Sequence, residues 1–297
     1  MKIAVISDIH GNVVALETVL KDLEQQGNAD HIVVTGDIFA YGPAPHEVFV
    51  TLQQLPNASF LLGNTDRYLL EGTYPSTSGG EEWWNRLLLS FHWTAEHMGR
   101  EGHRFLETLP LSQIIQEGDW RLLAVHGSPR SDEEGLTLKT CADDFDKMLD
   151  SRPDIVVCGH THVPMDCIVN GVRVVNVGSV GLPFDGDPRA CYAIISPPTA
   201  EGGVSTERHP DSSCVELRRV VYDVEKAVEQ FYAVSYPAAD VSAYNLWTGR
   251  PFGSSLIYTP EMRRPRPGPL RNGNGESKGT AQQGTFQPRA QVSQSLT

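Results

Sequence analysis

The chain opens with the stretch MKIAVISDIHGN at positions 1–12, and this stretch indicates the fold. Residues 3–6 form an apolar run of the length expected for a buried strand. Polar residues follow at once, with Asp8 and His10 two positions apart. Asn12 can then cap a helix, because apolar residues recur after it at helical spacing, at positions 13, 16, 19, 20 and 23. A strand that leads through a polar turn into a helix is typical of an α/β protein.

The same order of elements recurs along the chain. We expect strands over 31–35 and 59–62 with a helix over 45–55 between them, which favours parallel strands with helices packed outside. The region 81–109 is helical and rich in aromatic residues, which suit either a core or a cap over a cleft; the helical spacing favours the core. Later elements are expected at 121–125, 154–158, 167–177 (two strands about a turn), 191–196, 215–222 (strands) and 224–234 (a helix).

Composition divides the chain into three parts. We expect one domain over residues 1–235, an irregular extension over 236–262 and a disordered tail over 263–297, where Arg, Pro, Gly and Gln dominate. The chain has 297 residues and a formal net charge of −13, yet the tail holds six basic residues against one acidic residue. The rest of the chain is therefore strongly acidic, which argues against binding of long nucleic acids.

The sequence also argues against several classes of protein. No apolar run approaches the roughly 18 residues that a membrane helix needs, and charged residues come too early for a signal peptide. The five cysteines are odd in number and show no CxxC spacing, which favours reduced thiols over disulfides or a thiolate zinc site. We expect a cytoplasmic protein without membrane contact, and the sequence predicts no particular oligomeric state.

Polar side chains follow five of the expected strands at the points where the strands end. Because the carboxyl ends of parallel strands share one rim, we expect these residues in one place: Asp8, His10, Asp37, Asn64, His126, His160 and His162. Seven oxygen and nitrogen ligands are too many for one tetrahedral ion and suit two metals that share a carboxylate. A mixed set of carboxylates, imidazoles and an amide suits Mn²⁺, Fe or Zn²⁺ better than Mg²⁺.

These motifs, in this order, resemble the calcineurin-like metallophosphoesterase superfamily. The closer resemblance is to its compact bacterial and archaeal branch of small phosphodiesterases, and it covers about residues 1–196. It is carried by SDIHGN at 7–12, GD at 36–37, YGP at 41–43, GNTD at 63–66, HGSPR at 126–130, GHTHVP at 159–164, NVGSVG at 176–181 and DGDPRA at 185–190. The resemblance implies a four-layer α/β/β/α sandwich.

The resemblance also implies a role for each predicted ligand. The implied sets are Asp8, His10 and His162 for the first metal, Asn64, His126 and His160 for the second, and Asp37 as the bridge. A hydroxide that bridges the metals would attack phosphorus in line, and the cations would neutralise the phosphoryl oxygens. Asp37 and Asn64 are therefore predicted to be catalytic as well as ligating. Asp66 is a further catalytic candidate that would orient a ligand histidine.

One position departs from the family pattern. Many relatives carry a histidine where this chain has Thr65, and a threonine hydroxyl cannot protonate a leaving group near neutral pH as imidazole can. We therefore expect activated diesters to be cleaved better than alkyl monoesters. The residues predicted to contact substrate are Asn64, Thr65, Arg130, Ser179 and Arg189.

Several of these assignments have a structural alternative. Arg130 and Arg189 could clamp a phosphate or form surface ion pairs. Ser179 lies in a glycine-rich turn that either supplies backbone N–H groups or is only a tight turn. Tyr41 and Tyr68 could stack on a base or pack in the core, which we favour.

The predicted function is a phosphodiesterase that uses two divalent metal ions, with Mn²⁺ as the first choice, on a small nucleotide such as a 2′,3′-cyclic nucleotide. A phosphomonoesterase or protein phosphatase and a dinucleoside-polyphosphate hydrolase are the alternative enzymes. A catalytically silent binding or scaffold module is the alternative of another class. The intact ligand set argues against it, because a scaffold can lose ligands without penalty.

Overall fold

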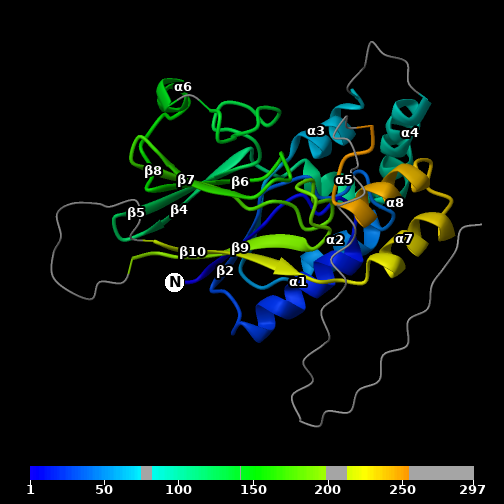
Figure 1. Ribbon diagram of the computed structural model, residues 1–297, viewed down its shortest axis with the longest axis horizontal. Coiled ribbons are helices and arrows are strands. Elements are labelled where there is room, and N and C mark those ends of the chain that lie inside the picture. The colour runs from blue at the N-terminus through cyan, green and yellow to red at the C-terminus, as the bar shows by residue number, and fades with distance from the viewer. Residues whose placement is uncertain (75–81, 141, 199–212, 254–297) are drawn as a thin grey trace, which may run out of the picture. The chain divides into compact units, whose positions relative to one another are not determined.

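Two five-stranded sheets form the centre of the computed structural model, which describes residues 1–74, 82–140, 142–198 and 213–253 (Figure 1). The strands of the first sheet are, in spatial order, β10 (Cys214–Val220), β9 (Ala190–Ser196), β1 (Ile3–Ile6), β2 (His31–Val34) and β3 (Ala58–Phe60). Those of the second are β4 (Ser112–Glu117), β5 (Trp120–Val125), β6 (Ile155–Cys158), β8 (Val172–Asn176) and β7 (Met165–Val169).

Each sheet has a parallel centre and antiparallel additions. β1, β2 and β3 are parallel, while β9 runs antiparallel to β1 and β10 antiparallel to β9. In the second sheet β5, β6 and β8 are parallel, and β4 and β7 pair antiparallel at the two edges. The loops that leave the parallel strands therefore come from two sheets rather than from the single rim that we expected.

The core between the sheets follows from the alternation of side chains along each strand. Ile3 and Val5 of β1 face the second sheet, where they pack with Leu122 and Val157. Ala4 and Ile6 of the same strand face the helices on the other side. Because residues on both faces are fully buried, β1 is apolar throughout, as is usual for a parallel strand covered on two sides.

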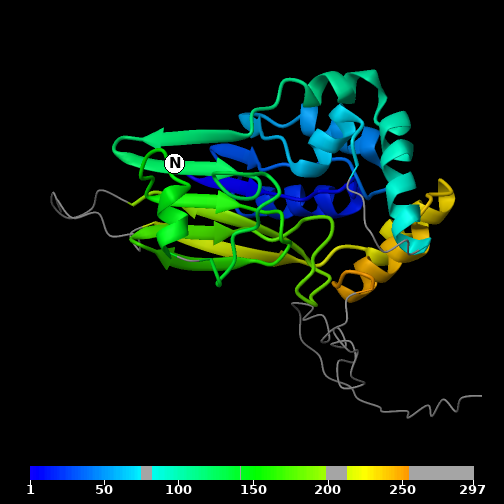
Figure 2. The same cartoon turned by 90° about the horizontal axis from the view of Figure 1, so that it is seen from above.

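Helices cover the outer face of each sheet (Figures 1 and 2). The cluster outside the first sheet draws on α1 (Val13–Gln25), α2 (Pro45–Gln53), α3 (Asn64–Glu71), α4 (Glu82–His97), α5 (Gly99–Leu106), α7 (Val224–Ala233) and α8 (Ala239–Thr248). Outside the second sheet lie α6 (Ala142–Lys147) and adjoining loops, with Phe145, Met148 and Leu136 packed beneath. The predicted four-layer sandwich is thus confirmed, with a thin fourth layer.

Three local expectations need correction. The extension expected to be irregular over 236–262 contains α8, which packs against α7, and the compact unit runs from Met1 to Ser254. The helical region expected over 81–109 is two helices, separated at Gly99, whose φ is 74°. The elements β4, α3 and α6 were not predicted. The expected tail over 263–297 lies outside the described residues. Within the described ranges, no helix is both long and apolar enough to cross a membrane.

Candidate metal centre

The structure brings the seven predicted ligands together between the two sheets. Asp8 and His10 follow β1, Asp37 follows β2, and Asn64 begins α3 just after β3. His126 follows β5, and His160 and His162 follow β6. All seven are shielded from solvent except His160, which is partly exposed. The strand-end argument therefore predicted the meeting point correctly, although two sheets supply the ligands.

The ligand loops hold backbone conformations that are costly for ordinary residues. Five of the seven have positive φ angles: Asp8 (54°), His10 (48°), Asp37 (54°), His160 (64°) and His162 (58°). A non-glycine residue in this left-handed region costs on the order of 1 kcal/mol or more. Such strain persists where the surroundings enforce it and is concentrated at functional sites, which supports a ligand role for these residues.

Two glycines make room for the carboxylates. A Cβ atom on Gly63 would lie 2.2 Å from Asp37 Oδ1, and one on Gly159 would lie 2.2 Å from Asp8 Oδ2 and 1.9 Å from Ser7 Oγ. Any side chain at either position would therefore displace a predicted ligand. Glycine is therefore required at both positions because a carboxylate approaches the backbone there closely.

The first group of ligands presents several acceptors to one another. His10 Nδ1 donates to the Ala40 carbonyl at 2.9 Å, and His162 Nδ1 donates to the Leu182 carbonyl at 2.5 Å. In the neutral form of both rings the Nε2 atoms are then acceptors, and they lie 3.1 Å apart. Asp8 Oδ1 lies 3.1 Å from His162 Nε2 and has no hydrogen-bond donor among the described residues. Buried lone pairs that face one another without a hydrogen atom between them are unfavourable, and a bound cation would relieve this cost.

A proton is poorly suited to be that cation. Burial, and then the charge that His162 would carry, lower the pKa of His10 to about 4. The imidazole of His10 is therefore neutral at physiological pH, the form in which histidine binds metals. The orphaned Asp8 oxygen and the facing Nε2 atoms thus fit a divalent ion held by Asp8, His10, His162 and Asp37, whose ligand atoms all lie within 4.8 Å of one another.

The second group has a similar arrangement. His126 Nδ1 donates to the Thr35 carbonyl at 2.8 Å, and its Nε2 lies 2.9 Å from Asn64 Oδ1 and 3.4 Å from Asp37 Oδ1. Although burial opposes it, the charge of Asp37 raises the pKa of His126 to about 10, so that Nε2 carries a proton that a metal ion would displace. His160 Nδ1 lies 3.0 Å from the same Asn64 oxygen. The donor set of amide oxygen, carboxylate and two imidazoles fits a second divalent ion.

Asp37 lies between the two groups. Its Oδ2 is 3.7 Å from His10 Nε2, and its Oδ1 is 3.4 Å from His126 Nε2. Although burial opposes ionisation, His126, His10 and the backbone N–H of Thr65 hold the pKa of Asp37 well below its usual range. An ionised carboxylate with one oxygen on each side is suited to bridge two cations.

Asp66 supports the site in a different way from the one predicted. Its carboxylate accepts hydrogen bonds from the backbone N–H groups of Ile38 (3.0 and 3.1 Å), Phe39 (3.4 Å) and Gly63 (3.2 Å), rather than from a histidine ring. Burial and the charge of Asp37 raise the pKa of Asp66 to about 7. Asp66 therefore joins the loops that carry Asp37 and Asn64, and its proposed contact with a ligand histidine was wrong.

Two predicted substrate contacts are buried beside the ligands. Ser179 Oγ donates to the Asp8 carbonyl at 2.7 Å and accepts from the Leu182 N–H at 2.7 Å, and the residue is fully buried. Ser179 is therefore a support for the first ligand group rather than an open substrate contact. The Thr65 N–H donates to Asp37 Oδ1 at 2.9 Å, while its buried hydroxyl has no partner among the described residues.

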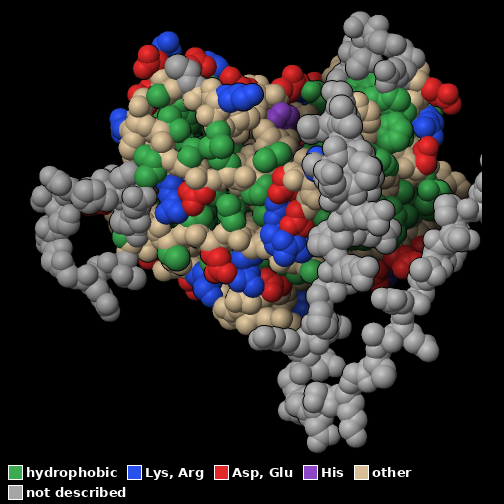
Figure 3. All heavy atoms as spheres, in the orientation of Figure 1, with side chains coloured by type: hydrophobic (Ala, Val, Ile, Leu, Met, Phe, Trp, Pro, Cys, Tyr) green, Lys and Arg blue, Asp and Glu red, His purple; other side chains and the backbone are tan. Residues whose placement is uncertain are grey.

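The two predicted phosphate clamps are engaged with carboxylates. Arg130 pairs with Glu134 and Asp144, and the Arg189 guanidinium binds Asp187 at 2.5–3.0 Å. Basic and acidic side chains are likewise intermixed on the face shown in Figure 3. These arrangements match the ion-pair alternative, so either arginine would have to leave its carboxylate to bind a phosphate.

Aromatic side chains pack directly on the first ligand group. The Tyr41 ring centroid lies 5.5 Å from that of His10. The Phe184 ring stacks on His162, with centroids 4.5 Å apart and planes 18° apart. The Tyr68 hydroxyl, in contrast, donates to Glu133 at 2.7 Å. Phe184 was missed because it lies in a loop with no periodic pattern, and no sequence signal marks it as a neighbour of His162.

Comparison with known proteins agrees with this geometry. A family model described as the calcineurin-like phosphoesterase superfamily domain matches residues 1–199. An uncharacterized protein of Methanocaldococcus jannaschii is 30% identical over 250 residues, which cover 77% of this chain and 90% of that protein. The phosphodiesterase YfcE of Escherichia coli K12 is 28% identical over 204 residues, which cover 66% of this chain and 87% of YfcE.

Solved structures support the same assignment. A crystal structure of a metallophosphoesterase from Sphaerobacter thermophilus is 30% identical, with a TM-score of 0.64; the match covers 84% of this chain and all of that one. The hypothetical protein PH1004 of Pyrococcus horikoshii shares the fold, with 21% identity and a TM-score of 0.67 over 84% of this chain and 99% of that one. The resemblance and the expected class of metal-dependent phosphoric ester hydrolases are confirmed: the chain belongs to the calcineurin-like phosphoesterase superfamily.

Proposed function

We propose that the protein is a phosphodiesterase that uses two divalent metal ions to hydrolyse small phosphodiesters. The observation that carries this proposal is the meeting of seven oxygen and nitrogen ligands in which imidazole Nε2 atoms face each other and face carboxylate or amide oxygens. Two cations held there would activate a water for attack on phosphorus and neutralise charge on the phosphoryl oxygens. The mixed donor set favours Mn²⁺, with Fe or Zn²⁺ as alternatives.

The chain's own residues supply position and charge. The carbonyls of Ala40, Leu182 and Thr35 hold Nδ1 of His10, His162 and His126 as donors, so that each neutral ring would present its Nε2 lone pair to a bound cation. Asp37, held ionised, would bind both cations. Asn64 would contribute a neutral ligand, which leaves the centre with a net positive charge toward an anionic substrate.

The preference for diesters comes from the absence of a proton donor at Thr65. Its hydroxyl is buried, and it has a pKa far above the neutral range, so it cannot protonate an alkoxide leaving group. Phosphoryl compounds that are activated by a good leaving group or by ring strain are then favoured, and 2′,3′-cyclic nucleotides, whose five-membered phosphate ring is strained, are the case that we propose. The acidic body of the protein would repel long polyanions.

We also propose a cytoplasmic location. Cys158, Cys167, Cys191 and Cys214 are all free thiols in the described part of the chain, as expected in a reducing compartment.

The experiment that tests the function is a substrate panel with and without metal. Bis(p-nitrophenyl) phosphate, p-nitrophenyl phosphate, 2′,3′-cyclic and 3′,5′-cyclic nucleotides and a dinucleoside polyphosphate are assayed with Mn²⁺, Zn²⁺, Mg²⁺ and EDTA. We expect metal-dependent turnover that is fastest on diesters. A rate that is highest on monoesters would favour a phosphatase, and no turnover on any compound would refute the enzyme.

Matched variants separate catalysis from binding. Asp37→Asn and Asn64→Ala should each lower the rate by at least about 100-fold. Asp119→Asn removes an exposed carboxylate in the turn between β4 and β5 and should leave the rate unchanged. A scaffold protein would show no metal-dependent rate in any of these forms.

A further inference from the structure

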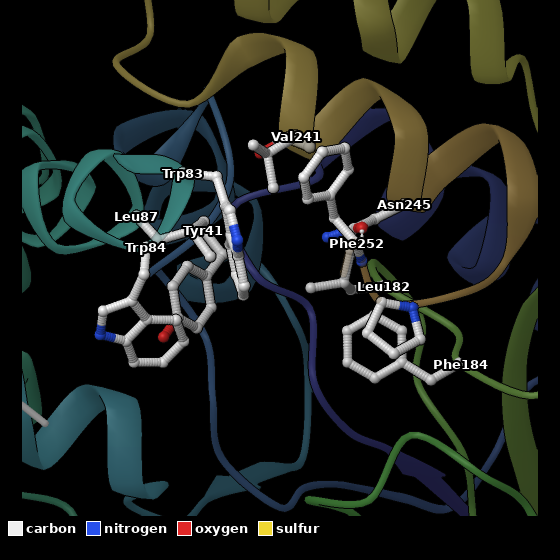
Figure 4. Close-up of a pocket in the computed structure, with 11 residues that line it drawn as sticks. Tyr41, Trp83, Trp84, Leu87, Leu182, Phe184, Val241, Asn245 and Phe252 are labelled. Atoms are coloured by element: carbon white, nitrogen blue, oxygen red, sulfur yellow. Dashed lines mark hydrogen bonds between the residues drawn. The ribbon is translucent and has the colours of Figure 1, made fainter. Parts of the chain in front are cut away.

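Figure 4 shows an aromatic pocket of about 200 Å³, two of whose lining residues, Tyr41 and Phe184, pack on the candidate ligands His10 and His162. Its aromatic side chains come from parts of the chain that are far apart in sequence: Tyr41, Trp83, Trp84, Phe184 and Phe252. Trp83 and Trp84 belong to α4, and Phe252 follows α8. The family model ends at residue 199, so the wall formed by α8 and the residues after it lies outside the part of the chain that the family defines.

The pocket shares its walls with the first ligand group. Phe184 stacks on the His162 ring, and Tyr41 packs on the His10 ring. Leu182, also a lining residue, accepts the hydrogen bond from His162 Nδ1 through its carbonyl. A phosphate bound at the centre would therefore have the pocket as its neighbour on the side of His10 and His162.

The walls are rigid. Tyr41 has a φ angle of 72° and packs edge-on against the fully buried Phe91, with ring centroids 5.1 Å apart. Trp83 contacts the Phe252 ring at 5.7 Å and, also at 5.7 Å, the Trp84 ring. These rings hold each other in place yet leave an open volume between them, whereas aromatic side chains that served only as core would fill it.

The chemistry of the walls indicates what would fit. None of the described residues that line the pocket is charged. One lining residue offers a fixed polar group: Asn245 Oδ1 accepts from the Phe252 N–H at 2.7 Å, which orients the carboxamide at the wall. Aromatic faces with a single fixed amide are typical of a site for a flat, neutral group with a polar edge. The volume is below the roughly 300–1,000 Å³ of sites for drug-sized ligands, so the group is compact.

We propose that this pocket is a subsite for the base of a nucleotide substrate whose phosphate lies at the metal centre. The inference rests on the proposed function, and it adds the place where the base of the nucleotide binds. A nucleobase is flat, has an edge of donors and acceptors that an amide can read, and stacks on aromatic rings. Because the walls of the pocket pack on His10 and His162, we expect it to bind the base of the substrate itself and not a separate ligand.

The test compares two diesters with the same leaving group. Thymidine 5′-(p-nitrophenyl phosphate) carries a base, and methyl p-nitrophenyl phosphate does not. Because the leaving group is the same, the ratio of their kcat/KM values measures the contribution of base binding. We expect Trp83→Leu to lower kcat/KM for the thymidine compound by roughly 10- to 100-fold, as expected for loss of a stacking face. The methyl compound should change less than twofold, and Trp83→Phe should restore most of the loss.

The matched control is Trp93→Leu. Trp93 lies on the same helix α4 but stacks on His97 and does not line the pocket. Trp93→Leu should leave the ratio of the two kcat/KM values unchanged. Equal losses on both diesters in Trp83→Leu would mean that Trp83 is only structural, and a wild-type ratio near one would mean that no base is bound. Either result overturns the subsite while leaving the proposed function intact.

A binding measurement keeps the two proposals separable. Thymidine 5′-monophosphate should quench the tryptophan fluorescence of the full-length protein in a saturable way, methyl phosphate should not, and Trp83→Leu should abolish the change. Saturable quenching without turnover on any substrate would support the pocket and refute the phosphodiesterase. No quenching, together with faster proteolysis after Gly253 in Trp83→Leu, would overturn the subsite and assign the pocket to the chain's own following residues.

Discussion

Asp8→Asn is expected to stabilise the metal-free protein and to weaken its response to metal. Asp8 is fully buried, and its Oδ1 has no donor and lies 3.1 Å from His162 Nε2, which is an acceptor in the neutral ring whose Nδ1 donates to Leu182. Its Oδ2 accepts from the His160 N–H at 3.0 Å. An asparagine in the same rotamer keeps the second bond and places an N–H group where two acceptors now face each other.

The magnitude follows from these contacts. Relief of a buried acceptor without a partner is worth about 1–3 kcal/mol, and the new hydrogen bond about 0.5–1.5 kcal/mol. The free energy of unfolding in EDTA should therefore rise by about 2–4 kcal/mol. At about 2–4 °C per kcal/mol for a domain of this size, Tm should increase by about 5–15 °C.

Metal should offset most of this advantage. Saturation of one site at a hundredfold excess over Kd adds about 2.7 kcal/mol to the wild type, whereas an amide is a poorer ligand than a carboxylate. The assay is thermal unfolding in EDTA and in Mn²⁺, with Asp119→Asn as the control that should match wild type in both. A variant less stable than wild type in EDTA would refute the reasoning, because it would show that His162 Nε2 holds a proton and pairs with Asp8.

Two further substitutions test residues that support the site, and a third tests an ion pair that supports the fold. Gly159→Ala places a Cβ atom 1.9 Å from Ser7 Oγ and 2.2 Å from Asp8 Oδ2; it should cost at least about 1–3 kcal/mol of stability in urea unfolding and abolish Mn²⁺ binding in calorimetry. Ser179→Ala removes the hydroxyl between the Asp8 carbonyl and the Leu182 N–H, and should weaken Mn²⁺ binding by roughly 10–100-fold with the fold retained; unchanged affinity would contradict the supporting role. Asp22→Asn breaks the bonds from Arg218 and Tyr192; the bond from Arg218, and to a lesser extent that from Tyr192, holds the pKa of Asp22 below its usual range. It should cost about 1–2 kcal/mol at pH 7, and the difference should vanish as the pH falls below 3.8 through the lowered pKa; a gap that persists at pH 2 would argue against an ionic origin.

The parts of the fold that could be predicted from the sequence are those with a strong periodic pattern. The run over 3–6, the helix capped by Asn12 and the turn at Asn170 were predicted because buried strands, amphipathic helices and hairpin turns impose clear spacing. The meeting of the seven candidate ligands could be predicted because strand ends converge in an α/β protein.

The missed elements lack such a pattern. β4 reads SQIIQE and is largely exposed at a sheet edge, so no alternation marks it. α3 begins with the polar residues Asn64, Thr65 and Asp66, which are buried by the site rather than by a core. The actual partners of Asp66 and Arg130 depend on which loops meet in space, and local sequence carries no information on that.

The supply of ligands by both sheets has a mechanical consequence. Asp8, His10, Asp37 and Asn64 belong to the first sheet, and His126, His160 and His162 to the second. An ion bound by the first ligand group would therefore join segments about 150 residues apart in the chain, as a cross-link would. This link can form only after both halves of the sandwich have met. Removal of the ions should let the two sheets part at this rim while the apolar layer between them holds the opposite side together.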